Sequence, residues 1–238
     1  MRVLCFALPE HGHLNPLLPT LRRLVDGGHD VTIAAVVDLA DVVASAGLKA
    51  RTRVLSSSLP ERVTRGAEFA ERLRDPTWLS SWIEALLLDG APGMVSVIDA
   101  VLQAERPDVV VVDPMFWAAV AACEKARVPW AAVSSSLNPV TPSRWRTALT
   151  DTLDGLSERR RRLFADRNLA PPIFRVADAI SPWLTIAFSA VEFVGQEQLG
   201  APVDDVHLVG APFADVDVDR RGGPPFDTTA LREGRRVY

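Results

Sequence analysis

The first 36 residues constrain the fold of this chain more than any other stretch. Val3–Leu8 and Asp30–Val36 are two short apolar runs of the residue types that strands favour. A helix separates them, because leucines recur between the two runs at helical spacing and Gly27-Gly28 then ends the pattern. Strand, helix and strand in so short a stretch form a βαβ unit, whose two strands must lie parallel in one sheet.

The turn after the first run carries the residues best suited to chemistry. It reads Glu10-His11-Gly12-His13, and we expect the following helix to begin at Pro16 with Asn15 as its N-cap. Such turns lie at the carboxyl edge of a parallel sheet, where ligands bind. Phosphate-binding turns are rich in glycine, whereas Gly12 stands alone and neither the dinucleotide fingerprint nor a P-loop is found. Imidazoles in this place indicate proton transfer.

The rest of the chain continues to alternate between strands and helices. Val109–Val112 is a pure valine run, which is typical of a strand buried on both faces. We therefore expect an α/β fold, Rossmann-like, with helices on both faces of a parallel sheet ordered 3-2-1-4-5 at its core. The other predicted strands cover 50–55, 129–134, 183–188 and 206–209, and the other predicted helices cover 38–46, 92–105, 116–126 and 141–169.

Composition limits the partners and the compartment. The net charge of −4 excludes the basic footprint of a nucleic-acid-binding protein. The two cysteines, Cys5 and Cys123, are expected to be buried free thiols in a reducing compartment. The first apolar run is too short for a signal peptide, and no stretch is expected to span a membrane. We therefore expect a cytoplasmic protein with no integral membrane segment.

The C-terminal stretch differs in character from the rest. Residues 1–213 are predicted to form one domain. Asp215–Gly223 is polar and without periodicity, and Pro224-Pro225 follows it, which is the composition of a linker. Residues 214–238 are accordingly interpreted as an interdomain linker and the first residues of a second domain.

His11-Gly12-His13-Leu14-Asn15-Pro16, followed by Leu-x-x-Leu-x-x-x-Gly-His-Asp-Val-Thr, resembles the N-terminus of the UDP-glycosyltransferase-like family. The nearest likeness is to bacterial enzymes that glycosylate antibiotics such as macrolides and enediynes. The resemblance implies the GT-B fold, in which two Rossmann-like halves face each other. This chain would be the N-terminal, acceptor-binding half, and it would be inactive without the donor-binding half.

The resemblance also implies a reaction. A sugar would move, with inversion, from a nucleotide-sugar of the UDP or TDP type to a hydroxyl of an apolar natural product such as an antibiotic aglycone. Neither a cofactor nor a metal is expected, since the nucleotide-sugar is a co-substrate. His13 matches the histidine that deprotonates the acceptor, and Asp113 matches the aspartate that balances it. Gly12 is assigned to binding of the co-substrate.

Topology independently predicts that His13 and Asp113 meet. They follow strands one and four, which are neighbours in the order 3-2-1-4-5 and open a crevice at their carboxyl ends. A carboxylate would fix the tautomer of the imidazole, and a helix N-terminus should keep that imidazole neutral. The alternatives are that Asp113 caps the next helix and that His13 is a turn residue. A metal pair with His11 is not favoured, because no ligand cluster follows.

Aromatic and polar side chains near the same edge suit a wide apolar acceptor. Tryptophans of amphipathic helices are usually core residues, and the polar residues could simply cap the next helix, so these assignments have ordinary alternatives. An alternative function is a stand-alone domain that binds a small molecule or a partner and catalyses nothing. The sequence names neither the sugar nor the acceptor, nor an oligomeric state. The residues assigned to acceptor binding are His11, Trp78, Trp82, Met115, Phe116, Trp117, Ser135, Ser136, Asn138 and Trp145.

Overall fold

The computed structural model describes residues 1–55, 67–72, 74–142, 145–194 and 206–212. Seven described strands form one sheet: β1 (Arg2–Phe6), β2 (Asp30–Ala35), β3 (Arg51–Val54), β4 (Val109–Val112), β5 (Trp130–Ser134), β8 (Leu184–Ala187) and β9 (Val206–Leu208). Their order is β3-β2-β1-β4-β5-β8-β9, and every neighbouring pair is parallel. The predicted order 3-2-1-4-5 is confirmed, and the two predicted later strands extend it.

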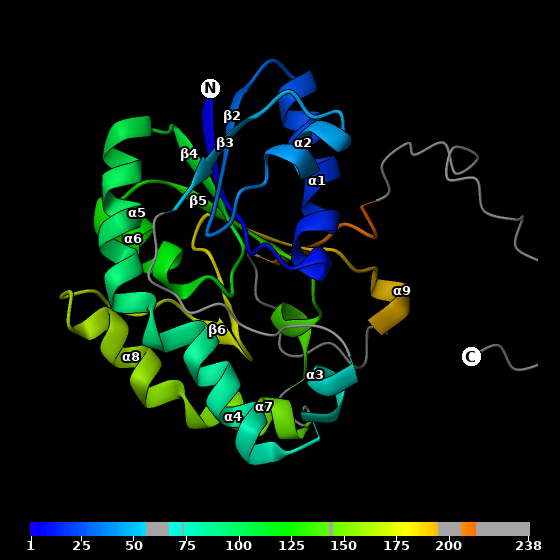
Figure 1. The fold of residues 1–238 in the computed structure, drawn as a ribbon, viewed down its shortest axis with the longest axis vertical. Helices are drawn as coiled ribbons and strands as arrows, with labels where there is room; N and C mark the ends of the chain where they lie inside the picture. The colour runs from blue at the N-terminus through cyan, green and yellow to red at the C-terminus, as the bar shows by residue number, and fades with distance from the viewer. Residues whose placement is uncertain (56–66, 73, 143–144, 195–205, 213–238) are drawn as a thin grey trace, which may run out of the picture.

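Helices cover both faces of this sheet (Figure 1). The described helices are α1 (His11–Asp26), α2 (Ala40–Ser45), α3 (Ala67–Arg72), α4 (Pro76–Glu84), the π-helical turn η1 (Ala85–Asp89), α5 (Ala91–Glu105), α6 (Trp117–Ala126), the 3-10 turn η2 (Asn138–Val140), α7 (Ala148–Gly155), α8 (Ser157–Ala165) and α9 (Val191–Val194). Figure 1 shows α1 and α2 on one side of the sheet and α5 and α6 on the other. This is the predicted Rossmann-like α/β class.

Strand β1 lies at the centre of the sheet and connects its two hydrophobic layers. Side chains alternate along a strand, so Val3 and Cys5 pack toward α1, while Leu4 and Phe6 pack into the cluster formed with α5 and α6. Cys5 and Cys123 are both buried and free, as predicted. The register of β1 with β4 places Phe6 beside Val112, so the segments that follow these two strands leave the sheet side by side.

Helix α1 begins at His11, five residues before the predicted start at Pro16, and Asn15 is not its N-cap. Pro16 and Pro19 therefore lie inside the helix, where each lacks the N–H group of a regular backbone hydrogen bond. Three leucines on the sheet-facing side of α1 are buried, and packing of such a face stabilises a helix more than local propensity does. The early start brings both His11 and His13 into the first turns of α1.

The run Pro76–Glu105, which covers α4, η1 and α5, is apolar and long enough to cross a membrane by length and composition alone. No stretch was expected to approach a membrane span, and this run does so by length and composition. In its most apolar window 44% of the residues are buried inside the protein. Helix α5 supplies six of the buried residues of the core next to α6, which accounts for its apolar character.

The charge-rich region after β5 also differs from the prediction. Instead of one helix over 141–169, two helices, α7 and α8, meet at Leu156. Helix α7 starts at Ala148 because Thr147 and Thr150 form a reciprocal capping box there. An antiparallel hairpin of β6 (Phe174–Arg175) and β7 (Asp178–Ala179) then follows, which was not predicted. The predicted linker and the boundary between 213 and 214 lie outside the described residues.

Candidate active site

His13 and Asp113 meet at the carboxyl edge of the sheet. His13 Nδ1 lies 2.7 Å from Asp113 Oδ2, a hydrogen-bond distance. The His13 side chain is 24% exposed and that of Asp113 is 5% exposed, so the imidazole faces the surface and the carboxylate lies behind it. The alternative that Asp113 caps the next helix is not met, because Phe116 holds the N-cap position of α6; instead, Asp113 Oδ1 accepts a hydrogen bond from the Met115 backbone N–H at 3.0 Å. Each carboxylate oxygen of Asp113 thus makes one hydrogen bond, Oδ2 with His13 and Oδ1 with the Met115 N–H.

The contact with Asp113 determines which ring nitrogen of His13 is available. An ionised carboxylate only accepts, so Nδ1 carries the proton that it donates to Asp113. The Ser135 hydroxyl lies 3.4 Å from the same nitrogen. No hydrogen bond joins Nε2 to any side chain in the described part of the chain. The neutral ring therefore has its lone pair at Nε2, where it can accept a proton from another molecule.

Three carboxylates act on the pKa of His13. Burial is the largest single influence and lowers this pKa, but the hydrogen bond and charge of Asp113, with the charges of Glu10 and Asp178, together raise it above its ordinary value. The expectation that the helix N-terminus keeps the ring neutral is therefore not met, because the acidic neighbours dominate. A raised pKa makes His13 a stronger base, and Asp113 stabilises the imidazolium that forms when it takes a proton.

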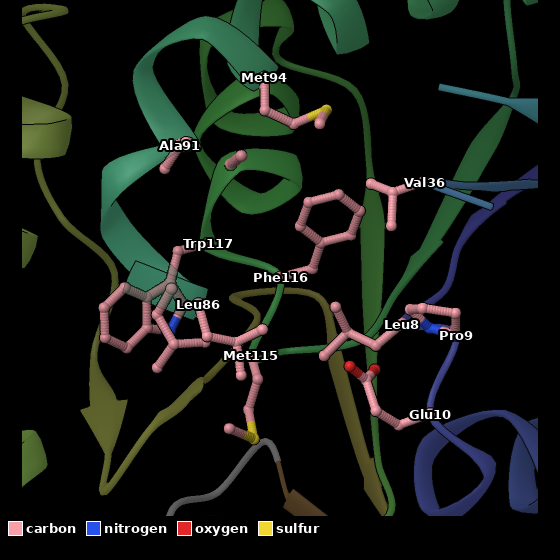
Figure 2. A pocket seen from close by; sticks show the side chains of 13 residues that line it. Leu8, Pro9, Glu10, Val36, Leu86, Ala91, Met94, Met115, Phe116 and Trp117 are labelled. Atoms are coloured by element: carbon pink, nitrogen blue, oxygen red, sulfur yellow. The ribbon is translucent and has the colours of Figure 1, made fainter. Parts of the chain in front are cut away.

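A mainly apolar pocket is lined by the segments that precede His13 and follow Asp113 in the chain, through Glu10 and Met115 (Figure 2). It encloses about 80 Å³, which is less than the roughly 300–1,000 Å³ of complete ligand sites, so it can hold one edge of a larger molecule. Met115, Phe116 and Trp117 line it, and these are three of the residues assigned to acceptor binding. The other lining residues are Leu8, Pro9, Glu10, Val36, Leu86, Leu87, Gly90, Ala91, Met94 and Ala118.

Two curated proteins resemble the chain in sequence, whereas no family model matches it. L-demethylnoviosyl transferase of Streptomyces niveus is 34% identical over 143 residues, which cover 60% of this chain and 36% of that protein. Demethyllactenocin mycarosyltransferase of Streptomyces fradiae is 32% identical over 127 residues, which cover 52% of this chain and 27% of that protein. The match therefore spans about a third of the length of these relatives.

Solved structures match over nearly the whole chain. The glycosyltransferase of kitacinnamycin has a TM-score of 0.61 at 20% identity, with 88% of this chain and 51% of that chain covered. The chain has the fold of one half of a GT-B antibiotic glycosyltransferase. The Streptomyces sp. SF2575 glycosyltransferase SsfS6, complexed with thymidine diphosphate, matches with a TM-score of 0.52 at 18% identity, over 84% of this chain and 52% of that chain. The predicted resemblance to antibiotic glycosyltransferases is confirmed, and the chain spans about half the length of these structures.

A second polar region of the site is the serine loop, residues 135–138, which follows β5. Ser135 lies beside His13, whereas Ser136 and Asn138 turn toward Asp178. The Asn138 amide donates to Asp178 Oδ1 at 2.7 Å, and the Ser134 and Ser136 hydroxyls contact Asp178 Oδ2. The loop is thus held by a buried carboxylate, and among the assigned polar residues only Ser135 is within hydrogen-bond distance of the His13–Asp113 pair.

Asp178 is the site residue that sequence reasoning missed. It is 1% exposed, and burial raises its pKa to about 6 although the Ser134 and Asn138 hydrogen bonds and the charge of His13 oppose this and the charge of Asp113 adds to it. Nothing in the sequence pattern indicated it, because its strand is two residues long and lacks periodicity. The hairpin that follows α8 brings Asp178 within electrostatic reach of His13 and Asp113.

The other assigned residues do not line the apolar pocket. Trp78 and Trp82 stack on each other on α4, with ring centroids 6.0 Å apart, and neither lines the apolar pocket. Trp145 is 39% exposed and lines a separate hollow beside Phe174. His11 is exposed. Gly12 is exposed in the first turn of α1, and no described atom lies within 4 Å of the position a Cβ would take there.

Proposed function

We propose that this chain is the acceptor-binding half of an inverting glycosyltransferase. The observation that carries the proposal is the 2.7 Å contact between His13 Nδ1 and Asp113 Oδ2, with Nε2 free of partners in the described residues. Sequence and fold similarity to antibiotic glycosyltransferases support the reaction class. The donor is a nucleotide-sugar of the UDP or TDP type, and a structural relative bound to thymidine diphosphate supports this choice.

The proposed reaction uses His13 as the general base. Nε2 removes the proton from an acceptor hydroxyl, and the oxygen attacks the anomeric carbon of the nucleotide-sugar from the side opposite the diphosphate. The bond between that carbon and the diphosphate breaks, so the configuration inverts and the nucleoside diphosphate leaves. The proton stays on His13, where Asp113 stabilises the imidazolium. Asp113 and Ser135 act through His13 and are positioning residues.

The acceptor is an apolar natural product with a hydroxyl, such as an antibiotic aglycone. The apolar pocket beside Glu10 receives one edge of it, with Met115, Phe116 and Trp117 as walls. Trp78, Trp82 and Trp145 lie elsewhere and are left out of the proposed acceptor site. In this account the reaction takes place in the cytoplasm and needs no metal or resident cofactor.

The stereochemistry of the product tests the proposal. In a protein that also carries a donor-binding half, transfer from a sugar whose anomeric bond to the diphosphate is α should give a β-glycoside, measurable from the proton coupling at the anomeric carbon by NMR. A product with retained configuration would contradict the single displacement. If the chain bound apolar compounds but no transfer occurred in any such protein, the alternative of a non-catalytic binding domain would hold.

A further inference from the structure

Glu10 is the single charged residue among the described residues that line the apolar pocket. Its Oε2 is buried and has no hydrogen-bond partner in the described part of the chain. Figure 2 shows the carboxylate turned toward the pocket interior, near Leu8 and below Phe116. Glu10 stands at the N-cap position of α1, but its side chain accepts no hydrogen bond from the helix.

A buried carboxylate oxygen of this kind is an unsatisfied hydrogen-bond acceptor. Removing it from water costs free energy that only a hydrogen bond can return, and native proteins rarely leave such an atom unpaired. Neither helix capping nor an ion pair with a described residue satisfies Glu10. A ligand that enters the pocket with a donor at this position would satisfy it, whereas a ligand with only apolar atoms would bury it further.

Backbone hydrogen bonds also connect the pocket walls to His13 and Asp113. The Glu10 backbone carbonyl accepts a hydrogen bond from the His13 N–H at 2.9 Å, and Met115 on another wall donates its N–H to Asp113. The negative charge of Glu10 contributes to the raised pKa of His13, which places the two side chains within electrostatic reach. A molecule anchored on Glu10 thus contacts the same two segments that carry His13 and Asp113.

We infer that Glu10 is a specificity-determining residue, which selects acceptors carrying a hydrogen-bond donor, a hydroxyl or a protonated amine, on the apolar edge that enters this pocket. The inference rests on the proposed function in taking the pocket as part of the acceptor site. A site built to hydrogen-bond such a group rejects the analogue that lacks it, because the protein atom is then left unpaired. The protonated amine should bind best, since a charged partner strengthens the hydrogen bond.

Three probes of one shape test this: benzylamine, benzyl alcohol and ethylbenzene, which place an ammonium, a hydroxyl and a methyl group on the same carbon. The chain has 3 methionines, and Met94 and Met115 line the pocket while Met1 is 63% exposed at the N-terminus. Methyl NMR of methionine-labelled protein therefore reports binding at two pocket positions, with Met1 as an internal control. The matched variants are Glu10→Gln, Glu10→Leu and the exposed-site control Glu71→Gln.

In the unmodified protein benzylamine should bind about tenfold or more tightly than ethylbenzene, with benzyl alcohol between them. Glu10→Gln should remove most of the benzylamine preference, Glu10→Leu should reverse it in favour of ethylbenzene, and Glu71→Gln should change nothing. Equal affinities for the three probes, an unchanged preference in Glu10→Gln, or no shift of the Met94 and Met115 methyls would overturn the inference. The titration involves no sugar transfer, so a negative result would not contradict the proposed roles of His13 and Asp113. A failed transfer assay, in turn, would not contradict the titration result.

Discussion

Replacing His13 with alanine is expected to slow sugar transfer by about 10²–10⁴-fold, the usual contribution of a general base. The acceptor hydroxyl would then have to lose its proton to water, while the apolar pocket, which His13 does not line, would bind the acceptor as before. We therefore expect the loss in kcat, with little change in the KM for the acceptor. The measurement is steady-state kinetics in a protein that also carries the donor-binding half.

Two further variants show whether the chosen histidine is the right one. Asp113→Asn should lose less activity than His13→Ala, since its task is to orient and balance the imidazole, and His11→Ala should lose least because His11 is exposed. If His11→Ala were the most damaging change, the base would be His11. If Asp113→Asn lowered the melting temperature and left turnover alone, its hydrogen bond to the Met115 N–H would be its main role. Stability must therefore be measured beside the rates.

Trp117→Ala is expected to lower the free energy of unfolding by about 3–5 kcal/mol, the usual cost of removing a large buried aromatic side chain. Trp117 is 1% exposed, and its ring meets that of Phe174 edge-on with centroids 5.9 Å apart. The guanidinium of Arg160 lies 5.1 Å from its centroid. Its Nε1–H donates to the Ala177 carbonyl at 2.7 Å, so truncation also leaves that carbonyl unpaired. Chemical denaturation followed by circular dichroism measures the change.

Matched substitutions separate packing from the hydrogen bond. Trp117→Phe keeps most of the buried ring and loses the N–H, so it should cost about 1 kcal/mol for the hydrogen bond plus a smaller packing loss. Trp183 is 64% exposed, and Trp183→Ala should stay within about 0.5 kcal/mol of the unmodified protein. If Trp117→Ala cost no more than Trp183→Ala, the structure of this core around α6 and the β6–β7 hairpin would be wrong.

The pairing of His13 with Asp113 could be predicted because it depends on topology. Parallel βαβ units leave few possible strand orders, and the valine run of β4 indicated a central strand. Once β1 and β4 are neighbours, the residues after Phe6 and Val112 must share one edge. Local rules predicted the start of α1 less well, because prolines usually mark a helix start and here the buried leucine face extends the helix past them.

Other parts of the site depend on tertiary contacts that leave no local pattern. Asp178 reaches the serine loop only because a two-residue strand folds back against η2, and such a hairpin has no periodicity to detect. Trp78 and Trp82 have the spacing of neighbours on one helix face, and they stack on each other instead of lining the pocket. The sequence placed Glu10 in the turn after the first strand, but nothing in it indicated that one carboxylate oxygen of Glu10 is buried without a hydrogen-bond partner among the described residues.

The titration of the His13 ring tests the central claim most directly. The chain has 4 histidines, so ¹H–¹⁵N NMR of the ring nitrogens can follow each one with pH in the chain as it stands. We predict that neutral His13 carries its proton on Nδ1 and that its pKa lies above the ordinary value of 6.5. Asp113→Asn should lower this pKa, because the hydrogen bond and the charge of Asp113 both raise it. A neutral His13 with its proton on Nε2 would contradict the claim, because Nε2 could not then take the proton of the acceptor hydroxyl. A pKa that does not respond to Asp113→Asn would also contradict it, because Asp113 would then not stabilise the imidazolium.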